Sequence, residues 1–133
     1  MCEKNSLWCS YQSIFFKVAQ HPVYPCFAIL TAFNPRSIVL SNKRNLVRHR
    51  QLELSLRRQC GEILPVTCSG PDGQWQELGF VVPMTREAAC REAARWGQNA
   101  IYWVEGNELF LVPVLLEGVQ TQRLGDWPSF LYT

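Results

Sequence analysis

The chain has 133 residues, 47% of them hydrophobic and 18% charged, with a net charge of +2. These values are typical of one folded domain, here residues 1–133, and exclude a disordered chain. No apolar run reaches the roughly 18 residues that a membrane-spanning helix needs, and the N-terminus lacks the basic and apolar regions of a signal peptide. We therefore expect a cytoplasmic protein with no membrane segment.

Two strands and a helix are predicted in the first half of the chain. Residues 13–18 have the pattern of a short strand, and the continuous apolar run 26–33 is typical of a buried one. Pro35 ends this second strand because it has no backbone N–H to offer a sheet. Ser41 can accept a hydrogen bond at a helix N-terminus, so a helix is predicted from there to about residue 59.

Two further strands and a second helix follow. Residues 62–68 and 77–82 are apolar enough to form strands, and the Ser-Gly-Pro-Asp-Gly sequence at 69–73 predicts a turn between them. Thr85 is a suitable N-cap for a helix over residues 86–96. This segment is rich in alanine, whose small side chain allows a helix to lie close to a sheet.

The last two predicted strands are residues 99–104 and 109–116, and Gly106-Asn107 suits a two-residue hairpin between them. Pro113 places the second of these strands at a sheet edge or at a bulge. The segment after residue 117 has no clear period. Three apolar residues are predicted to pin it to the body of the protein: Trp127, Phe130 and Leu131.

Hairpins joined by helices predict an α+β fold. We expect a mixed or antiparallel sheet of about six strands with two helices packed on it, in the order ββαββαββ. Residues 7–116 would form the core and residues 117–133 a C-terminal tail.

The six cysteines and two histidines do not form a metal-binding pattern. No Cys-x-x-Cys pair occurs, whereas structural zinc sites normally have closely paired ligands. A chain of this length with an ample apolar content also does not need disulfides. We expect reduced cysteines that pack as small apolar side chains, and the sequence predicts neither a metal nor a cofactor.

Polar residues share one face of the first predicted helix with apolar ones. Asn45 and His49 are in line with Leu52 and Leu56. Because the leucines should face the sheet, the polar pair should point inward as well, near Asn34. Two interpretations remain open: half-buried groups bonded to loop backbone, or part of a binding site.

Charge is distributed unevenly along the chain. Residues 36–58 carry seven cations and one anion, a net +6, whereas the rest carries six cations and ten anions, a net −4. The candidate partner-binding residues, here called the basic face, are Lys43, Arg44, Val47, Arg50, Leu54, Arg57 and Arg58. This face is either a solvated surface or a docking face for an acidic protein or another polyanion. Its two aliphatic residues favour a protein partner.

Four segments form a distinctive pattern: Thr-Ala-Phe-Asn-Pro at 31–35, Asn45 with Leu52 in the helix that follows, Trp-Gln-Glu at 75–77, and Gly-Gln-Asn-Ala-Ile at 97–101. In this pattern the chain resembles the bacterial domain-of-unknown-function 3293 family over about residues 7–116. The early segment 7–18 also resembles the first strand of this family, which carries a tyrosine like Tyr11. The resemblance implies a fold and a compartment, and it implies no established activity.

The same pattern marks polar residues at the ends of predicted elements. If the strands adjoin, these residues would form a rim of amides with one carboxylate, which suits a small polar ligand. The candidate ligand-binding residues are Asn34, Asn45, His49, Glu77, Gln98 and Asn99. In the alternative interpretation, Asn34 and Asn99 are only turn and cap residues.

The sequence has none of the usual phosphate-loop, nucleophile-elbow or metalloprotease motifs. We therefore favour a binding or regulatory module that uses the basic face for an acidic partner and the amide rim for a small ligand. The alternative is a small enzyme for a nucleotide-like or amide substrate, with Glu77 and His49 as the acid–base pair. A third hypothesis is nucleic-acid binding by the arginine-rich helix. The sequence leaves the ligand and the oligomeric state open.

Overall fold

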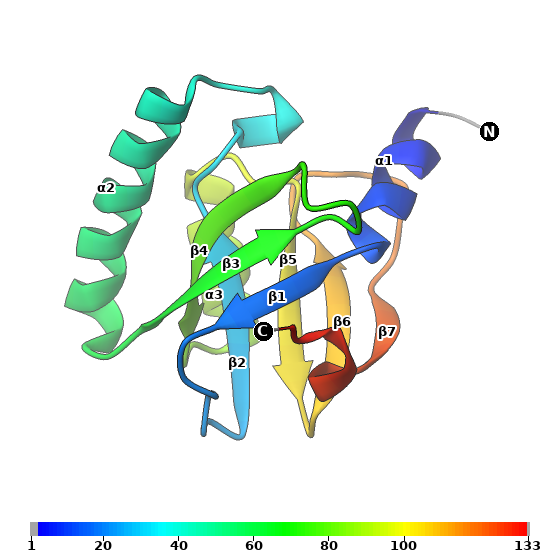
Figure 1. Ribbon diagram of the computed structural model, residues 1–133. Coiled ribbons are helices and arrows are strands. Elements are labelled where there is room, and N and C mark those ends of the chain that lie inside the picture. The colour runs from blue at the N-terminus through cyan, green and yellow to red at the C-terminus, as the bar shows by residue number, and fades with distance from the viewer. Residues whose placement is uncertain (1–2, 133) are drawn as a thin grey trace.

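The computed structural model describes residues 3–132, which form one antiparallel sheet of seven strands with three α-helices (Figure 1). The strand order is β1-β3-β4-β2-β5-β6-β7. The elements are α1 (Glu3–Gln12), β1 (Phe15–Val18), β2 (Cys26–Thr31), η1 (Pro35–Ser37), α2 (Asn42–Cys60), β3 (Leu64–Ser69), β4 (Gln76–Val82), α3 (Arg86–Arg95), β5 (Ala100–Glu105), β6 (Glu108–Pro113), β7 (Gln122–Asp126) and η2 (Trp127–Phe130). The predicted α+β class is confirmed, with one strand and one helix more than expected.

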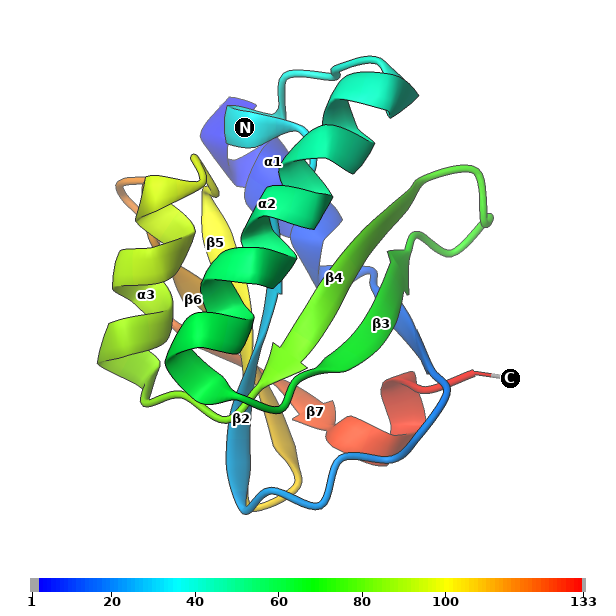
Figure 2. The same cartoon turned by 90° about the vertical axis from the view of Figure 1, so that its left-hand side faces the viewer.

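Helices α2 and α3 lie side by side over one face of the sheet (Figure 2). Both begin as the sequence predicts, because the Ser41 and Thr85 side chains accept hydrogen bonds from backbone N–H groups of the first turn. Leu52 and Leu56 of α2 are fully buried in a cluster with the small residues of α3 and alternate residues of the central strands. This cluster is the larger part of the core.

A buried polar contact joins the two helices. Glu92 of α3 accepts hydrogen bonds of 3.0 Å from both Ser55 and Gln59 of α2. Only 4% of Glu92 is exposed, so its carboxylate depends on these partners. The helices therefore sit at a fixed position over the sheet.

The other face of the sheet is concave because the strands curl toward each other at the two edges. Phe16 of β1 and Trp127 of η2 meet inside this curl, with ring centroids 5.1 Å apart. Leu131 forms a parallel bridge to Phe16, and the Tyr132 N–H donates to the Phe16 carbonyl at 3.0 Å. The C-terminal segment thus ties one sheet edge to the other.

Two elements were not predicted from the sequence. Helix α1 contains Tyr11, which the family resemblance placed in a first strand over residues 7–18, whereas only Phe15–Val18 of that segment forms a strand. The apolar side chains of α1 do not form a regular stripe, so periodicity could not reveal the helix. Strand β7 is polar and contains Gly125, but it pairs with the open edge of β6. The segment expected to be an unpatterned tail therefore supplies a strand, and the predicted anchor Trp127 is buried.

The hairpin at Gly106-Asn107 forms as predicted between β5 and β6, with a positive φ at both residues. Pro113 lies at the end of β6, beyond the residues that pair with β7. Its missing N–H therefore costs no sheet hydrogen bond on that side.

Candidate functional site

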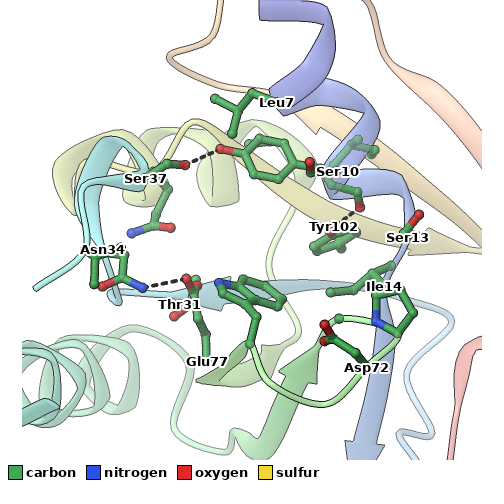
Figure 3. A pocket seen from close by; sticks show the side chains of 18 residues that line it. Leu7, Ser10, Ser13, Ile14, Thr31, Asn34, Ser37, Asp72, Glu77 and Tyr102 are labelled. Carbon is green, nitrogen blue, oxygen red and sulfur yellow. Dashed lines mark hydrogen bonds between the residues drawn. The ribbon is translucent and has the colours of Figure 1, made fainter. Parts of the chain in front are cut away.

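One end of the curled sheet holds a pocket of about 530 Å³ beneath α1 (Figure 3). Its walls come from α1, the linker after it, the loop that follows β2, the β3–β4 turn, and the start of β5. The lining residues are Leu7, Ser10, Tyr11, Ser13, Ile14, Thr31, Asn34, Ser37, Val39, Gly70, Pro71, Asp72, Trp75, Glu77, Gln98, Ala100, Tyr102 and Leu111. The volume is in the range of small-molecule sites, and apolar walls with a few polar groups are typical of them.

Glu77 of β4 is the most deeply buried carboxyl group of the pocket, with only 8% of the residue exposed. Burial raises the pKa of Glu77 to about 7, although hydrogen bonds from the side chains of Asn34 and Trp75 act in the opposite direction. The Asn34 amide donates to Glu77 Oε2 at 3.1 Å (Figure 3). The carboxyl group can therefore hold or release a proton near neutral pH.

The loop that carries Asn34 is held in an unusual conformation. Asn34, Arg36 and Ser37 all have positive φ, at 46°, 54° and 62°. Non-glycine residues rarely adopt such angles, and they persist where surrounding contacts enforce them. Asn45 of α2 supplies those contacts: its Oδ1 accepts from the Asn34 N–H at 2.9 Å, and its Nδ2 donates to Asn34 Oδ1 at 2.8 Å. Asn45 thus positions Asn34 from behind the pocket and does not line it.

The loop after α3 packs directly against the Asn34 loop. The Arg36 N–H donates to the Gly97 carbonyl at 2.7 Å, and Gln98 Nε2 donates to the Phe33 carbonyl at 3.1 Å. Gly97 has φ of +71°, and a side-chain carbon there would lie 2.9 Å from Pro35 Cβ. A glycine is therefore required for this contact, which brings the two most distinctive sequence motifs together.

Tyr11 closes the opposite side of the pocket. Its hydroxyl lies 2.6 Å from Ser37 Oγ and accepts from Asn99 Nδ2 at 3.1 Å. The buried Tyr102 hydroxyl donates to the Tyr11 carbonyl at 2.5 Å. Asn99 is therefore bonded to two lining residues at the pocket rim, without lining the pocket itself.

A family model described as "Protein of unknown function (DUF3293)" matches residues 30–101, which is more than half of the chain. The chain belongs to this family. The resemblance seen in the sequence is thereby confirmed. No curated protein and no solved structure matches the chain.

The matched span of the DUF3293 protein contains the polar side of the pocket and only part of its walls. Asn34, Asn45, Glu77 and Gln98 lie within residues 30–101. Helix α1, which covers the pocket, lies outside the match, as does Leu111.

His49 does not reach the pocket. Its ring stacks on Phe80, with centroids 4.6 Å apart and an interplanar angle of 4°. Phe80 and Glu77 are three residues apart on β4, so their side chains point to opposite faces of the sheet. The predicted acid–base pair of Glu77 and His49 is therefore wrong: His49 faces the helix layer, where burial lowers its pKa.

All seven residues of the basic face are exposed on the outer side of α2 in this DUF3293 protein. Val47 and Leu54 have exposed fractions of 53% and 58%. Arg57 forms an i,i+4 ion pair with Glu53 at 3.0 Å. The placement leaves these side chains accessible to a partner, away from the pocket.

Arg48 has a structural role. In the sequence it is only one of the seven cations of residues 36–58. Its Nε donates to the Ala32 carbonyl at 2.6 Å, and its Nη2 donates to the Trp96 carbonyl at 2.5 Å. The guanidinium also lies over the Trp96 ring, 5.8 Å from the centroid. Arg48 therefore clamps the two loops that form the polar side of the pocket. The signal in the sequence for this role is that Arg48 follows the inward-facing Asn45 by three residues.

The described part of the chain offers no other chemistry for a site. Within residues 3–132 no group of three or more metal-ligating side chains comes together, and no helix could cross a bilayer. Cys9, Cys26, Cys60, Cys68 and Cys90 are free thiols.

Proposed function

We propose that this DUF3293 protein binds a small organic ligand in the pocket beneath α1, with Glu77 as the anchoring group. The observation that carries the proposal is a buried carboxyl group, held by Asn34, on the wall of a pocket of about 530 Å³. Burying a carboxyl group is unfavourable unless it is paired or has a function, and the raised pKa of Glu77 reflects that cost. Apolar side chains such as Leu7 and Ile14 supply the surface that a ligand would cover.

A fragment screen by protein-observed NMR tests this proposal. We expect fragments to shift amide signals of pocket residues in the wild type and to lose most of this effect in Glu77→Gln. Glu117→Gln is the matched control, because Glu117 is an exposed carboxylate outside the pocket. If every fragment that binds in the pocket binds wild type and Glu77→Gln equally, Glu77 is not the anchor and the proposal fails.

The second candidate function is acid–base catalysis by Glu77. A pKa of about 7 suits a group that must both accept and donate a proton near neutral pH. Without His49, Asn34 holds the Glu77 carboxyl group, and Gln98, whose Nε2 is bonded to backbone carbonyls, can offer its Oε1 to position a substrate. Chemical conversion of a pocket fragment by the wild type, abolished in Glu77→Gln, would favour an enzyme over a binding protein.

For the basic face we propose docking of an acidic protein. Exposed cations around two exposed aliphatic side chains support this proposal, because phosphate contacts alone do not need an aliphatic centre. The test is pull-down with wild type and the charge-reversed pair Arg50→Glu/Arg57→Glu, followed by binding measurements on the recovered partner. Retention of that partner by the reversed pair would contradict the proposal. Nucleic-acid binding would instead have a steep dependence on salt.

A further inference from the structure

We infer that the ligand of the pocket is an organic cation, in which a protonated nitrogen is attached to a flat, apolar body. This inference rests on the proposed binding function and specifies the class of ligand. It follows from the charges that line the pocket, from the hydrogen-bonding groups left over there, and from its aromatic walls.

Among the described residues that line the pocket, the only charged side chains are acidic. Among these residues the ionisable acids are Glu77 and Asp72, and no lysine, arginine or histidine is present. The nearest cations in sequence do not enter: Arg36 is exposed and outside the lining, and Arg48 is bonded to backbone carbonyls behind it. A phosphate or carboxylate ligand would therefore meet unbalanced negative charge, whereas a cation would be attracted.

The hydrogen-bonding groups point to the same class. Most of the Asn34 amide is engaged, since its Nδ2 donates one N–H to Glu77 and its Oδ1 accepts from Leu40 N and Asn45 Nδ2. The Gln98 Nε2 donates to the carbonyls of Phe33 and Trp96.

Glu77, Gln98 Oε1 and the Asp72 carboxylate, one oxygen of which accepts from Gln74 N, give the pocket a group of acceptors. A ligand that brings N–H donors is well matched to them. Protonated amines and amidines carry several N–H donors and form charge-assisted bonds with a carboxylate.

Aromatic side chains form much of the remaining wall. Trp75 is 40% exposed beside Glu77, and Tyr11 and Tyr102 line the opposite side. The faces of aromatic rings attract cations and stack with flat apolar groups. The pocket thus combines a deep carboxylate with aromatic surfaces, as sites for aryl or alkyl amines require.

Three isosteric compounds test the inference: benzamidine is a cation, benzamide is neutral and benzoate is an anion. We expect benzamidine to bind at least tenfold more tightly than benzamide at pH 8, and benzoate to bind least, in NMR titrations that follow pocket amides. Glu77→Gln should lower benzamidine affinity at least tenfold and leave benzamide affinity nearly unchanged. Glu117→Gln, the control, should match the wild type.

The outcomes separate the inference from the function on which it rests. Benzoate or benzamide binding as tightly as benzamidine would overturn the cation inference and leave a ligand pocket in place. Failure of all three compounds and of the fragment library to shift any pocket amide would overturn both. The backbone spectrum of Glu77→Gln shows whether this variant keeps the wild-type fold. Asp72→Asn removes the other acidic group of the described lining at an exposed position, so it tests the charge of the pocket without disturbing a buried residue.

Discussion

Asn34 and Glu77 are joined by a hydrogen bond of 3.1 Å between the Asn34 amide and Glu77 Oε2, although 43 residues separate them in sequence. The amide of Asn34 is also fixed by Asn45, so the carboxyl group is held by a chain of two asparagines that begins on α2. Because this carboxyl group is buried, its protonation should be measurable in the stability of the whole fold.

Glu77→Gln is expected to stabilise the protein at alkaline pH. The folded-state pKa of about 7 lies above the ordinary glutamate value of 4.5, so the folded protein binds more protons between these values and loses stability as the pH rises through that window. The loss amounts to roughly 3 kcal/mol above pH 7, and glutamine, which stays neutral, avoids it. Chemical denaturation at pH 5 and pH 8 should show that the stability of the wild type falls relative to that of Glu77→Gln as the pH rises.

Other titratable groups near Glu77 do not change the sign of this effect. Asp72, Tyr11 and Tyr102 line the same pocket, and Cys68 is paired with Glu77 on β3. Burial raises the pKa of both Tyr102 and Cys68, so these two groups stay neutral between pH 5 and 8. His49 acts in the opposite direction, because burial lowers its pKa, but it is present in both proteins and cancels in their comparison. If the stabilities of the wild type and Glu77→Gln change with pH in the same way, Glu77 is ionised throughout.

Asn45→Ala is expected to lower the free energy of unfolding by about 2 kcal/mol, because it leaves the Asn34 N–H and side chain without their partner. It should also weaken ligand binding, since the Asn34 loop then loses the contacts that hold its positive φ angles. Asn42→Ala is the control, because Asn42 is exposed in the first turn of the same helix. Equal stability of the two variants would mean that the asparagine pair contributes nothing.

Arg48→Ala is expected to cost about 2 kcal/mol, since the charged side chain donates to two backbone carbonyls and covers the Trp96 ring. Arg50→Ala, which removes an exposed arginine of the same helix, should change stability by less than about 0.5 kcal/mol. Thermal denaturation of both variants measures the difference. A similar loss of stability in both variants would mean that Arg48 contributes no more than an exposed, solvated arginine.

Gly79→Ala is expected to prevent normal pairing of β2 and β4. A side-chain carbon at Gly79 would lie 2.5 Å from the Leu30 carbonyl oxygen, which belongs to the sheet backbone and has little freedom to move. Such overpacking costs about 3 kcal/mol or more. Gly70→Ala offers the contrast, because its nearest neighbours would lie 3.8 Å away. Soluble yield and circular dichroism of the two variants should differ accordingly.

Much of the fold could be predicted from local signals. Ser41 and Thr85 cap helices because their hydroxyl groups accept from the first turn, and this chemistry needs no knowledge of the tertiary structure. Strand β7 gave no such signal, since its polar residues become a strand only because β6 has a free edge beside them. Helix α1 likewise has no stripe of apolar residues to reveal it.

Only part of the candidate site could be predicted from the sequence. The predicted rim residues Asn34, Glu77 and Gln98 do line one pocket, while Asn45 and Asn99 act through neighbouring residues. The error with His49 has a clear cause. Helical periodicity showed that His49 faces inward with Leu52, but it could not show that α2 covers the face of β4 opposite to Glu77.

Helix α1 is attached to the sheet through side chains, by the burial of Trp8 and by the bonds of Tyr11 with Ser37, Asn99 and Tyr102. Elements held in this way open at a lower free energy than a paired strand, so the cover can detach while the sheet stays intact. Access to the pocket therefore does not require unfolding of the core. A bound molecule would slow the hydrogen exchange of those α1 amides that exchange when the helix detaches, which makes the helix a built-in reporter of occupancy.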